Sequence, residues 1–397
     1  MKKIALSLFT AGALLTSCSS DDNNLTTTAQ VEAPATYQFE RDGNSTVSYS
    51  GQTTRIEMGE ELVDALKNST STEAEIDGMF TNTGSYFSSS ELNTSSKNLR
   101  SKTAASTDYF SANTTTANAI RAQFDSYIEG QVSEVFPNWN TVATPGNAGQ
   151  LQENGGTIRY VNAKGLEYDQ AVNKGLIGAL MVDQMLNNYL STSVLDAGSN
   201  RADNDAEILA EGKDYTVMEH KWDEAFGYLY GTDDALAPQL GADSFLNKYV
   251  ARVENDEDFT GIAQEIYDAF KLGRAAITEK NYEVRDEQAQ IIREKISEII
   301  AIRAVYYLQS AKSVLGTDNG SAFHDLSEGY GFVMSLQFTR QPGTDIPYFT
   351  KAEVDGYLTQ LMEGNGFWDL TSSTLDAMSE EIAAPFNFTI AQASPSN

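Results

Sequence analysis

The chain has 397 residues, of which 41% are hydrophobic, and a formal net charge of −29. A chain this acidic repels nucleic acid and anionic lipid headgroups, so we expect no nucleic-acid partner. Cations are the small partners that this charge favours. The length allows one large hydrophobic core or two modest ones. Because Cys18 is the only cysteine, no disulfide is available to stabilise the fold.

The first residues are typical of a secretory signal peptide. Lys2 and Lys3 precede a short apolar stretch, and small residues follow it up to Cys18. The apolar stretch is shorter than the roughly 20 residues of a transmembrane helix, so we expect residues 1–17 to be cleaved off. The four residues that end at Cys18, Leu-Thr-Ser-Cys, resemble the bacterial lipobox. This resemblance implies that lipid on Cys18 anchors the mature protein to a membrane.

Residues 18–36 are rich in Ser, Thr, Asn and Asp and are expected to form a tether behind the lipid. Its first residues, 19–24, resemble the surface-export signal of lipoproteins in Bacteroidota, and they are equally typical of a plain solvated tether. We therefore predict an outer-membrane lipoprotein, with periplasmic and cell-surface exposure both open.

Residues 37–116 predict a small N-terminal segment of strands and loops. Asp42-Gly43 is a turn signal between short runs of β-forming residues, so we expect a β-hairpin there. One short helix is expected over 58–67. The Ser-, Thr- and Asn-rich residues 81–116 are expected to form a long loop.

From residue 117 to the end of the chain, apolar residues recur at helical spacing. The longest predicted helices cover residues 166–190, 260–278 and 283–315. The expected fold class is mainly α, a duplicated helical bundle with a small N-terminal β-hairpin element. Its two halves are expected at about 117–245 and 246–397.

The duplication is inferred from a repeat around the only two histidines. Each histidine is followed by a glutamate four residues later and a glycine seven residues later, with aromatic residues on both sides of the glycine. The first copy comprises His220, Trp222, Asp223, Glu224, Phe226, Gly227 and Tyr228, and the second comprises His324, Glu328, Tyr330, Gly331 and Phe332.

At this spacing the histidine, glutamate and glycine of each copy fall on one face of a helix. If two related helices met about a pseudo-twofold axis, the two His/Glu pairs would come together. Imidazole and carboxylate groups are ligands for iron or zinc, and Asp223 adds a further oxygen. The alternative is that each pair is a hydrogen-bonded contact that locks two helices together without metal. Both interpretations stay open.

Asp183 and Arg303 occupy matching places in the helices that precede the two histidine motifs. One interpretation is a buried ion pair between them. The other is that each side chain makes its own separate polar contacts.

The segment Met-Glu-His-Lys-Trp-Asp-Glu-Ala-Phe-Gly-Tyr at residues 218–228 resembles an uncharacterised family of Bacteroidota lipoproteins, the domain of unknown function 4856. More distantly, a duplicated bundle with a His/Glu motif resembles imelysin and related periplasmic iron-uptake proteins. That resemblance implies two bundle halves, a metal-associated motif and a role in iron acquisition. The chain departs from the His-x-x-Glu pattern, because Asp223 and Ser327 stand three residues after the histidines.

The sequence contains no zinc-protease helix, no nucleophile elbow and no phosphate loop. We therefore predict a non-enzymatic, metal-binding or metal-uptake accessory lipoprotein, with iron or zinc as its cofactor and other envelope metal-uptake proteins as its partners. The alternatives are a structural or partner-binding surface lipoprotein and an imelysin-like metallopeptidase.

Overall fold

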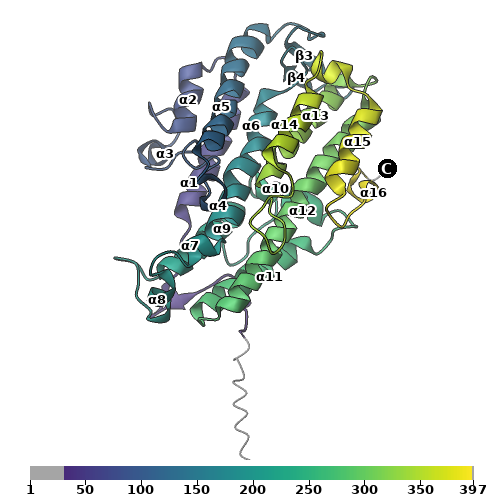
Figure 1. Cartoon of the computed structure of the whole chain (residues 1–397). Helices are drawn as coiled ribbons and strands as arrows, with labels where there is room; N and C mark the ends of the chain where they lie inside the picture. Colours follow the sequence, from purple (N-terminus) through teal and green to yellow (C-terminus); the bar gives the residue numbers. More distant parts are fainter. Residues whose placement is uncertain (1–30, 396–397) are drawn as a thin grey trace, which may run out of the picture. The chain divides into compact units, whose positions relative to one another are not determined.

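The computed structural model describes residues 31–395, and helices make up most of them (Figure 1). Cys18 and the predicted signal peptide lie outside the described residues. In chain order the elements are β1 (Glu40–Arg41), β2 (Asn44–Ser45), α1 (Ser50–Leu66), α2 (Glu73–Thr81), α3 (Ser90–Thr94), α4 (Thr107–Phe110), α5 (Thr114–Gly130), η1 (Gln131–Val135), η2 (Phe136–Asn138), β3 (Gly149–Gln152), β4 (Ile158–Val161), α6 (Tyr168–Leu176), η3 (Ile177–Val182), η4 (Met185–Tyr189), α7 (Thr192–Leu195), α8 (Asn200–Asp205), α9 (Val217–Tyr230), α10 (Leu246–Glu254), α11 (Ile262–Thr278), α12 (Tyr282–Val314), α13 (Asn319–Ser335), η5 (Leu336–Phe338), α14 (Lys351–Leu361), η6 (Gly366–Asp369), α15 (Ser372–Ala383) and α16 (Ile390–Ala393).

The predicted mainly α fold with a small N-terminal hairpin is confirmed. Strands β1 and β2 pair in antiparallel orientation across Asp42 and Gly43, which both have positive φ angles, 53° and 81°. Glycine adopts this backbone region without steric cost, which explains the turn. A second antiparallel hairpin, β3–β4, was not predicted.

The N-terminal segment is more helical than expected. Helix α1 begins at Ser50, and its apolar residues Ile56, Met58, Leu62 and Leu66 are buried. The expected loop over residues 81–116 contains the short helices α3 and α4. Short polar helices of this kind lack the long apolar periodicity by which a helix is found in a sequence.

Helix α12 is the longest element and packs against α11, α13 and α15 (Figure 1). Helix α13 in turn packs against α6. The predicted helix over 166–190 is the run α6–η3–η4, in which nearly every residue is buried. A helical run that is buried on all sides is expected in the centre of a large fold.

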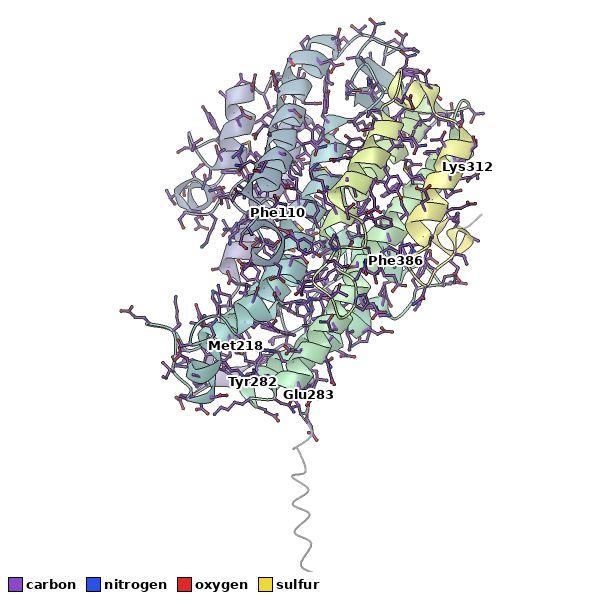
Figure 2. All side chains as sticks on the ribbon, viewed as in Figure 1. Phe110, Met218, Tyr282, Glu283, Lys312 and Phe386 are labelled. Carbon is purple, nitrogen blue, oxygen red and sulfur yellow. The ribbon has the colours of Figure 1, made fainter. Side chains whose placement is uncertain are left out.

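One continuous hydrophobic core extends from Tyr37 to Ala393, so both predicted halves of the bundle contribute to it. Side chains fill the space between the helices (Figure 2). Arg285 of α12 contacts α9, with Nη1 3.3 Å from the sulfur of Met218. Across the described part of the chain, no helix has the length and apolar character needed to cross a membrane.

Candidate functional site

His220 lies in the first turns of α9, behind a capping box in which Thr216 and Glu219 exchange hydrogen bonds. Its Nδ1 is 2.9 Å from the carbonyl oxygen of Ser48. A carbonyl can only accept, so Nδ1 carries the proton. The ring stacks on Tyr215 with the ring centres 4.6 Å apart. Burial lowers the pKa of His220 despite the nearby Glu224 carboxylate.

Glu224 has other partners closer to it than the histidine. Its Oε2 is 2.7 Å from Lys221 Nζ but 4.0 Å from His220 Nε2. Gln52 Nε2 donates to the second oxygen at 3.3 Å. Burial raises the pKa of Glu224, but Lys221 outweighs it and leaves the pKa below the ordinary value.

Asp223 belongs to a buried hydrogen-bond network. Its Oδ1 accepts from Arg274 Nε at 3.1 Å and from the Tyr37 hydroxyl at 2.7 Å, and its Oδ2 accepts from the Ser48 amide at 3.1 Å. Arg274 also contacts Glu219 at 3.1 Å. These bonds tie the N-terminal segment to α9 and α11, so the polar groups of the first motif are used by the fold.

His324 of the second motif is held by a residue that the sequence did not single out. Glu167, which directly precedes α6, places its Oε2 2.8 Å from His324 Nδ1. Burial acts against the charge of His324, but the hydrogen bond and charge of Glu167, with Glu328, raise its pKa above the ordinary value. The opposite directions of the two histidine pKa shifts show that the motifs have different surroundings.

Glu328 is buried beside Lys174 of α6. Its Oε1 lies 3.1 Å from Lys174 Nζ and accepts from the Tyr249 hydroxyl at 3.3 Å. Burial raises the pKa of Glu328, but Lys174 and then His324 outweigh it and lower the pKa to about 2. Glu328 is therefore a carboxylate at neutral pH.

The two motifs make matching contacts with the helix that each packs against. The third residue after each histidine accepts a backbone N–H from a residue close to the start of that helix: Asp223 from Ser48, two residues before α1, at 3.1 Å, and Ser327 from Glu167, directly before α6, at 2.9 Å. In both motifs the histidine Nδ1 bonds to that same residue, Ser48 or Glu167. This correspondence is what a duplicated helical unit would produce, and duplication remains a prediction.

The glycines of both motifs are points of close helix contact. A Cβ added at Gly227 would lie 2.4 Å from the Tyr49 Cβ at the start of α1, and one added at Gly331 would lie 2.4 Å from the Lys174 Cβ of α6. At both sites the absence of a side chain on the glycine therefore lets another segment approach the motif helix closely. The approaching helices are α1 and α6, so the two motif helices do not meet through their glycine faces.

The aromatic residues of the motifs lie in the core around these crossings. Those of the first motif contact the N-terminal segment, η4 and α11, and those of the second contact α5 and α10. The contacts are Trp222 Nε1 to the Phe270 carbonyl oxygen at 3.0 Å, Phe226 stacked on Tyr37 at 3.7 Å, Tyr228 near Tyr189 at 6.2 Å, Tyr330 to the Tyr127 hydroxyl at 3.0 Å, and Phe332 against Tyr249 at 4.7 Å.

The expected convergence of the two motifs around one metal ion was wrong for the part of the chain described. Over residues 31–395, no group of three or more His, Cys, Asp or Glu side chains is placed to hold a metal ion. The physical reason is that His220 is bound to the segment before α1 and His324 to the residue before α6. Asp223, at three residues from His220, is turned into the Arg274 network.

A cavity of about 530 Å³ opens beside the second motif, where α10, α12 and α13 meet. It is lined almost entirely by charged and polar side chains, with two tyrosines. The lining residues are Lys248, Arg252, Asn255, Asp256, Arg303, Tyr306, Tyr307, His324, Asp325, Glu328 and Pro395.

Arg303 lies against this cavity and is only 5% exposed. Its guanidinium carbon is 3.9 Å from the ring centre of Tyr306 and 4.5 Å from that of Tyr307. Among the residues described, Nε has no hydrogen-bond partner. Of the two interpretations of Asp183 and Arg303, the structure shows separate contacts and not an ion pair, because the Asp183 carboxylate accepts the backbone N–H groups of Ala105 and Ser106 at 2.9 Å each while Arg303 stacks on the two tyrosines.

The cavity residues on α10 were missed because that helix was not predicted. Leu246, Tyr249, Val250 and Val253 of α10 are buried at helical spacing, which is a signal that the sequence contained. Glu167 and Lys174 carried no such signal, because nothing local in the sequence links them to a helix more than 150 residues later.

The sequence model of the family described as "Domain of unknown function (DUF4856)" matches residues 34–389, a span that includes both histidine motifs and every cavity-lining residue except Pro395. No curated protein and no solved structure matches the chain. Because the match covers nearly all of the described fold, the chain belongs to the DUF4856 family.

Proposed function

We propose that this protein is a non-enzymatic, outer-membrane lipoprotein that binds a small polar molecule in the cavity beside His324. The observation that carries this proposal is the cavity itself, about 530 Å³ in volume, with Arg303 buried at its wall and unpaired among residues 31–395. Small-molecule sites in proteins are concave and typically measure a few hundred to a thousand Å³. Helices α10, α12 and α13 hold the lining side chains on rigid elements.

The first motif supports a structural role for His220. Its polar groups are paired with Ser48, Lys221, Gln52 and Arg274, so the contacts there hold helices together. The contacts of the first copy therefore support the structural interpretation. The cavity beside the second copy supports the binding of a small molecule there.

Metal uptake is the second candidate, and one observation favours it. Histidines that bind metals commonly donate their other ring nitrogen to a carboxylate, and His324 Nδ1 is paired with Glu167 in this way, which leaves Nε2 for a ligand. Iron or zinc at Nε2 would fit the imelysin-like interpretation. Three cations on the same cavity, Lys248, Arg252 and Arg303, would repel such an ion.

The proposal is tested by melting the purified mature protein with a panel of amino acids, neutral sugars, sugar acids, sugar phosphates, zinc and iron(II). A ligand at a hundred times its Kd stabilises the native state by about 2.7 kcal/mol, which raises the melting temperature by roughly a few degrees. Asn255→Trp places a bulky ring at the cavity rim, and Asn154→Trp, on the β3–β4 turn, is its matched control.

We expect at least one compound to stabilise the wild type and Asn154→Trp but not Asn255→Trp. Stabilisation by an organic compound supports the main proposal, and stabilisation by zinc or iron alone supports metal uptake. The binding proposal is overturned if no compound stabilises the protein, or if every compound acts equally on Asn255→Trp.

A further inference from the structure

We infer that the cavity recognises an anionic group of its ligand, a carboxylate or a phosphate, through Arg303 with Lys248 and Arg252 beside it. This inference rests on the proposed binding function and names the chemistry of the ligand.

Arg303 differs from the other buried arginines of α11, α12 and the segment after α13. Arg274, Arg285 and Arg340 each contact at least one carboxylate, and Arg293 donates to the carbonyl oxygens of Leu186 and Leu190. Arg303 stacks on tyrosines and, within residues 31–395, has neither a carboxylate within ion-pair distance nor a partner for Nε. A buried charge without a partner is costly, so a group of this kind marks a place where a ligand supplies the missing charge.

The carboxylates around the cavity are already engaged by protein groups. Glu328 is paired with Lys174, Asp325 accepts from the Ser310 hydroxyl at 2.7 Å, and Asp256 accepts from the backbone of Asp258 at 3.1 Å. None of the three is within ion-pair distance of a cation on the cavity wall, so they leave those cations to another partner.

The other charged groups on the cavity wall are cations. Lys248 and Arg252 project from successive turns of α10, and Arg303 faces them from α12. For none of the three does the described part of the chain provide an ion pair. Burial, followed by Lys174 and then by Arg252 and Arg303, lowers the pKa of Lys248 although Glu328 acts against it, which shows how closely these positive charges are gathered. In a chain of net charge −29, such a gathering favours an anion.

The test uses two pairs of sugars that differ only in the anionic group: galacturonate with galactose, and glucose 6-phosphate with glucose. Affinities are measured by calorimetry on the mature protein. We expect the anionic member of at least one pair to bind at least about tenfold more tightly than its neutral counterpart, because hydrogen bonds to charged groups contribute that much or more. The pair that discriminates tells whether carboxylate or phosphate is preferred.

Arg303→Met removes the charge and keeps much of the volume. We expect this variant to bind the anionic sugar no better than the neutral one, while its melting temperature without ligand stays at or above that of the wild type. Arg293→Met on the same helix is the matched control, because Arg293 is also buried but donates to the carbonyl oxygens of Leu186 and Leu190. That variant should melt at a lower temperature and, once folded, still discriminate between the sugars.

The inference fails if neither pair discriminates, or if Arg303→Met keeps the preference for the anion. It also fails if Arg303→Met melts well below the wild type without ligand, since Arg303 would then be a structural residue. Binding of neutral sugars that Asn255→Trp abolishes would leave the proposed function standing and overturn only the anionic chemistry. If no panel compound binds in the cavity, the proposed function itself fails.

Discussion

Glu167 gives the two histidines opposite electrostatic behaviour although their sequence patterns match. His220 faces a carbonyl oxygen, which adds no negative charge, so burial dominates and lowers its pKa. His324 faces the carboxylate of Glu167, which is itself only 3% exposed, and its pKa is raised. A buried carboxylate stabilises the imidazolium form of its partner because little solvent screens the charge.

These shifts predict that His324 keeps its proton to a higher pH than His220. The chain has only two histidines, so the imidazole signals of a proton NMR titration contain two curves, which His220→Gln and His324→Gln assign. The midpoint of His220 should lie below the ordinary value near 6.5 and that of His324 above it. In Glu167→Gln the midpoint of His324 should fall toward that of His220. Equal midpoints, or the reverse order, would show that the Glu167 contact is absent in solution.

At the scale of the elements, α1 and α6 cross the motif helices closely at Gly227 and Gly331. Alanine at either position would place its Cβ 2.4 Å from another Cβ, closer than unbonded carbon atoms approach. We expect Gly227→Ala and Gly331→Ala each to lower the free energy of unfolding by about 1 to 3 kcal/mol, the usual cost of overpacking. Urea denaturation measures this loss.

The control for both glycine variants is Gly356→Ala in α14. This glycine is exposed, and an added Cβ has no neighbour within 4 Å. Alanine should therefore raise the free energy of unfolding by up to about 1 kcal/mol, because it suits a helix better than glycine. If all three variants shift stability in the same direction, the close crossings are not constraints of the fold.

Prediction from the sequence succeeded where structure follows from local pattern. Helices α11 and α12 were predicted within a few residues of their ends, because the periodicity that marks a helix is local. The prediction that the two histidines converge was wrong for the described residues, because the repeated sequence pattern does not reveal which helix packs against each glycine. The cavity depends on α10, α12 and α13 meeting, which is tertiary information that one sequence does not contain.

At the scale of the whole molecule, excess negative charge reaches the interior. Burial raises the pKa of Asp169 to about 6, with help from Glu167, and that of Asp183 to about 6. Burial also raises the pKa of Asp243 to about 7. In the unfolded chain an aspartate has a pKa near 3.9. The folded state therefore binds these protons more tightly than the unfolded chain does. At neutral pH, ionisation of these buried aspartates destabilises the fold.

The sign of these shifts predicts that the protein is more stable in mild acid than at pH 8. A raised folded pKa contributes stability that is complete below the unfolded value near 3.9 and is lost as pH rises through about 6 to 7. Glu328, with its pKa lowered to about 2, acts oppositely and contributes stability that is lost in strong acid. The melting temperature should therefore rise by roughly a few degrees from pH 8 to about pH 5 and fall again below about pH 4.

Asp183→Asn isolates one contributor to this pH dependence, because an amide oxygen can accept the N–H groups of Ala105 and Ser106 as the carboxylate does. At pH 8 this variant should melt at or above the wild type, since it removes a buried charge, and at pH 5 the difference should shrink because the wild-type carboxyl is then largely protonated. Melting curves of both proteins between pH 4 and pH 8 measure the change. A wild-type melting temperature that falls steadily from pH 8 to pH 5, or an Asp183→Asn difference independent of pH, would contradict the assignment of these buried acids as the source.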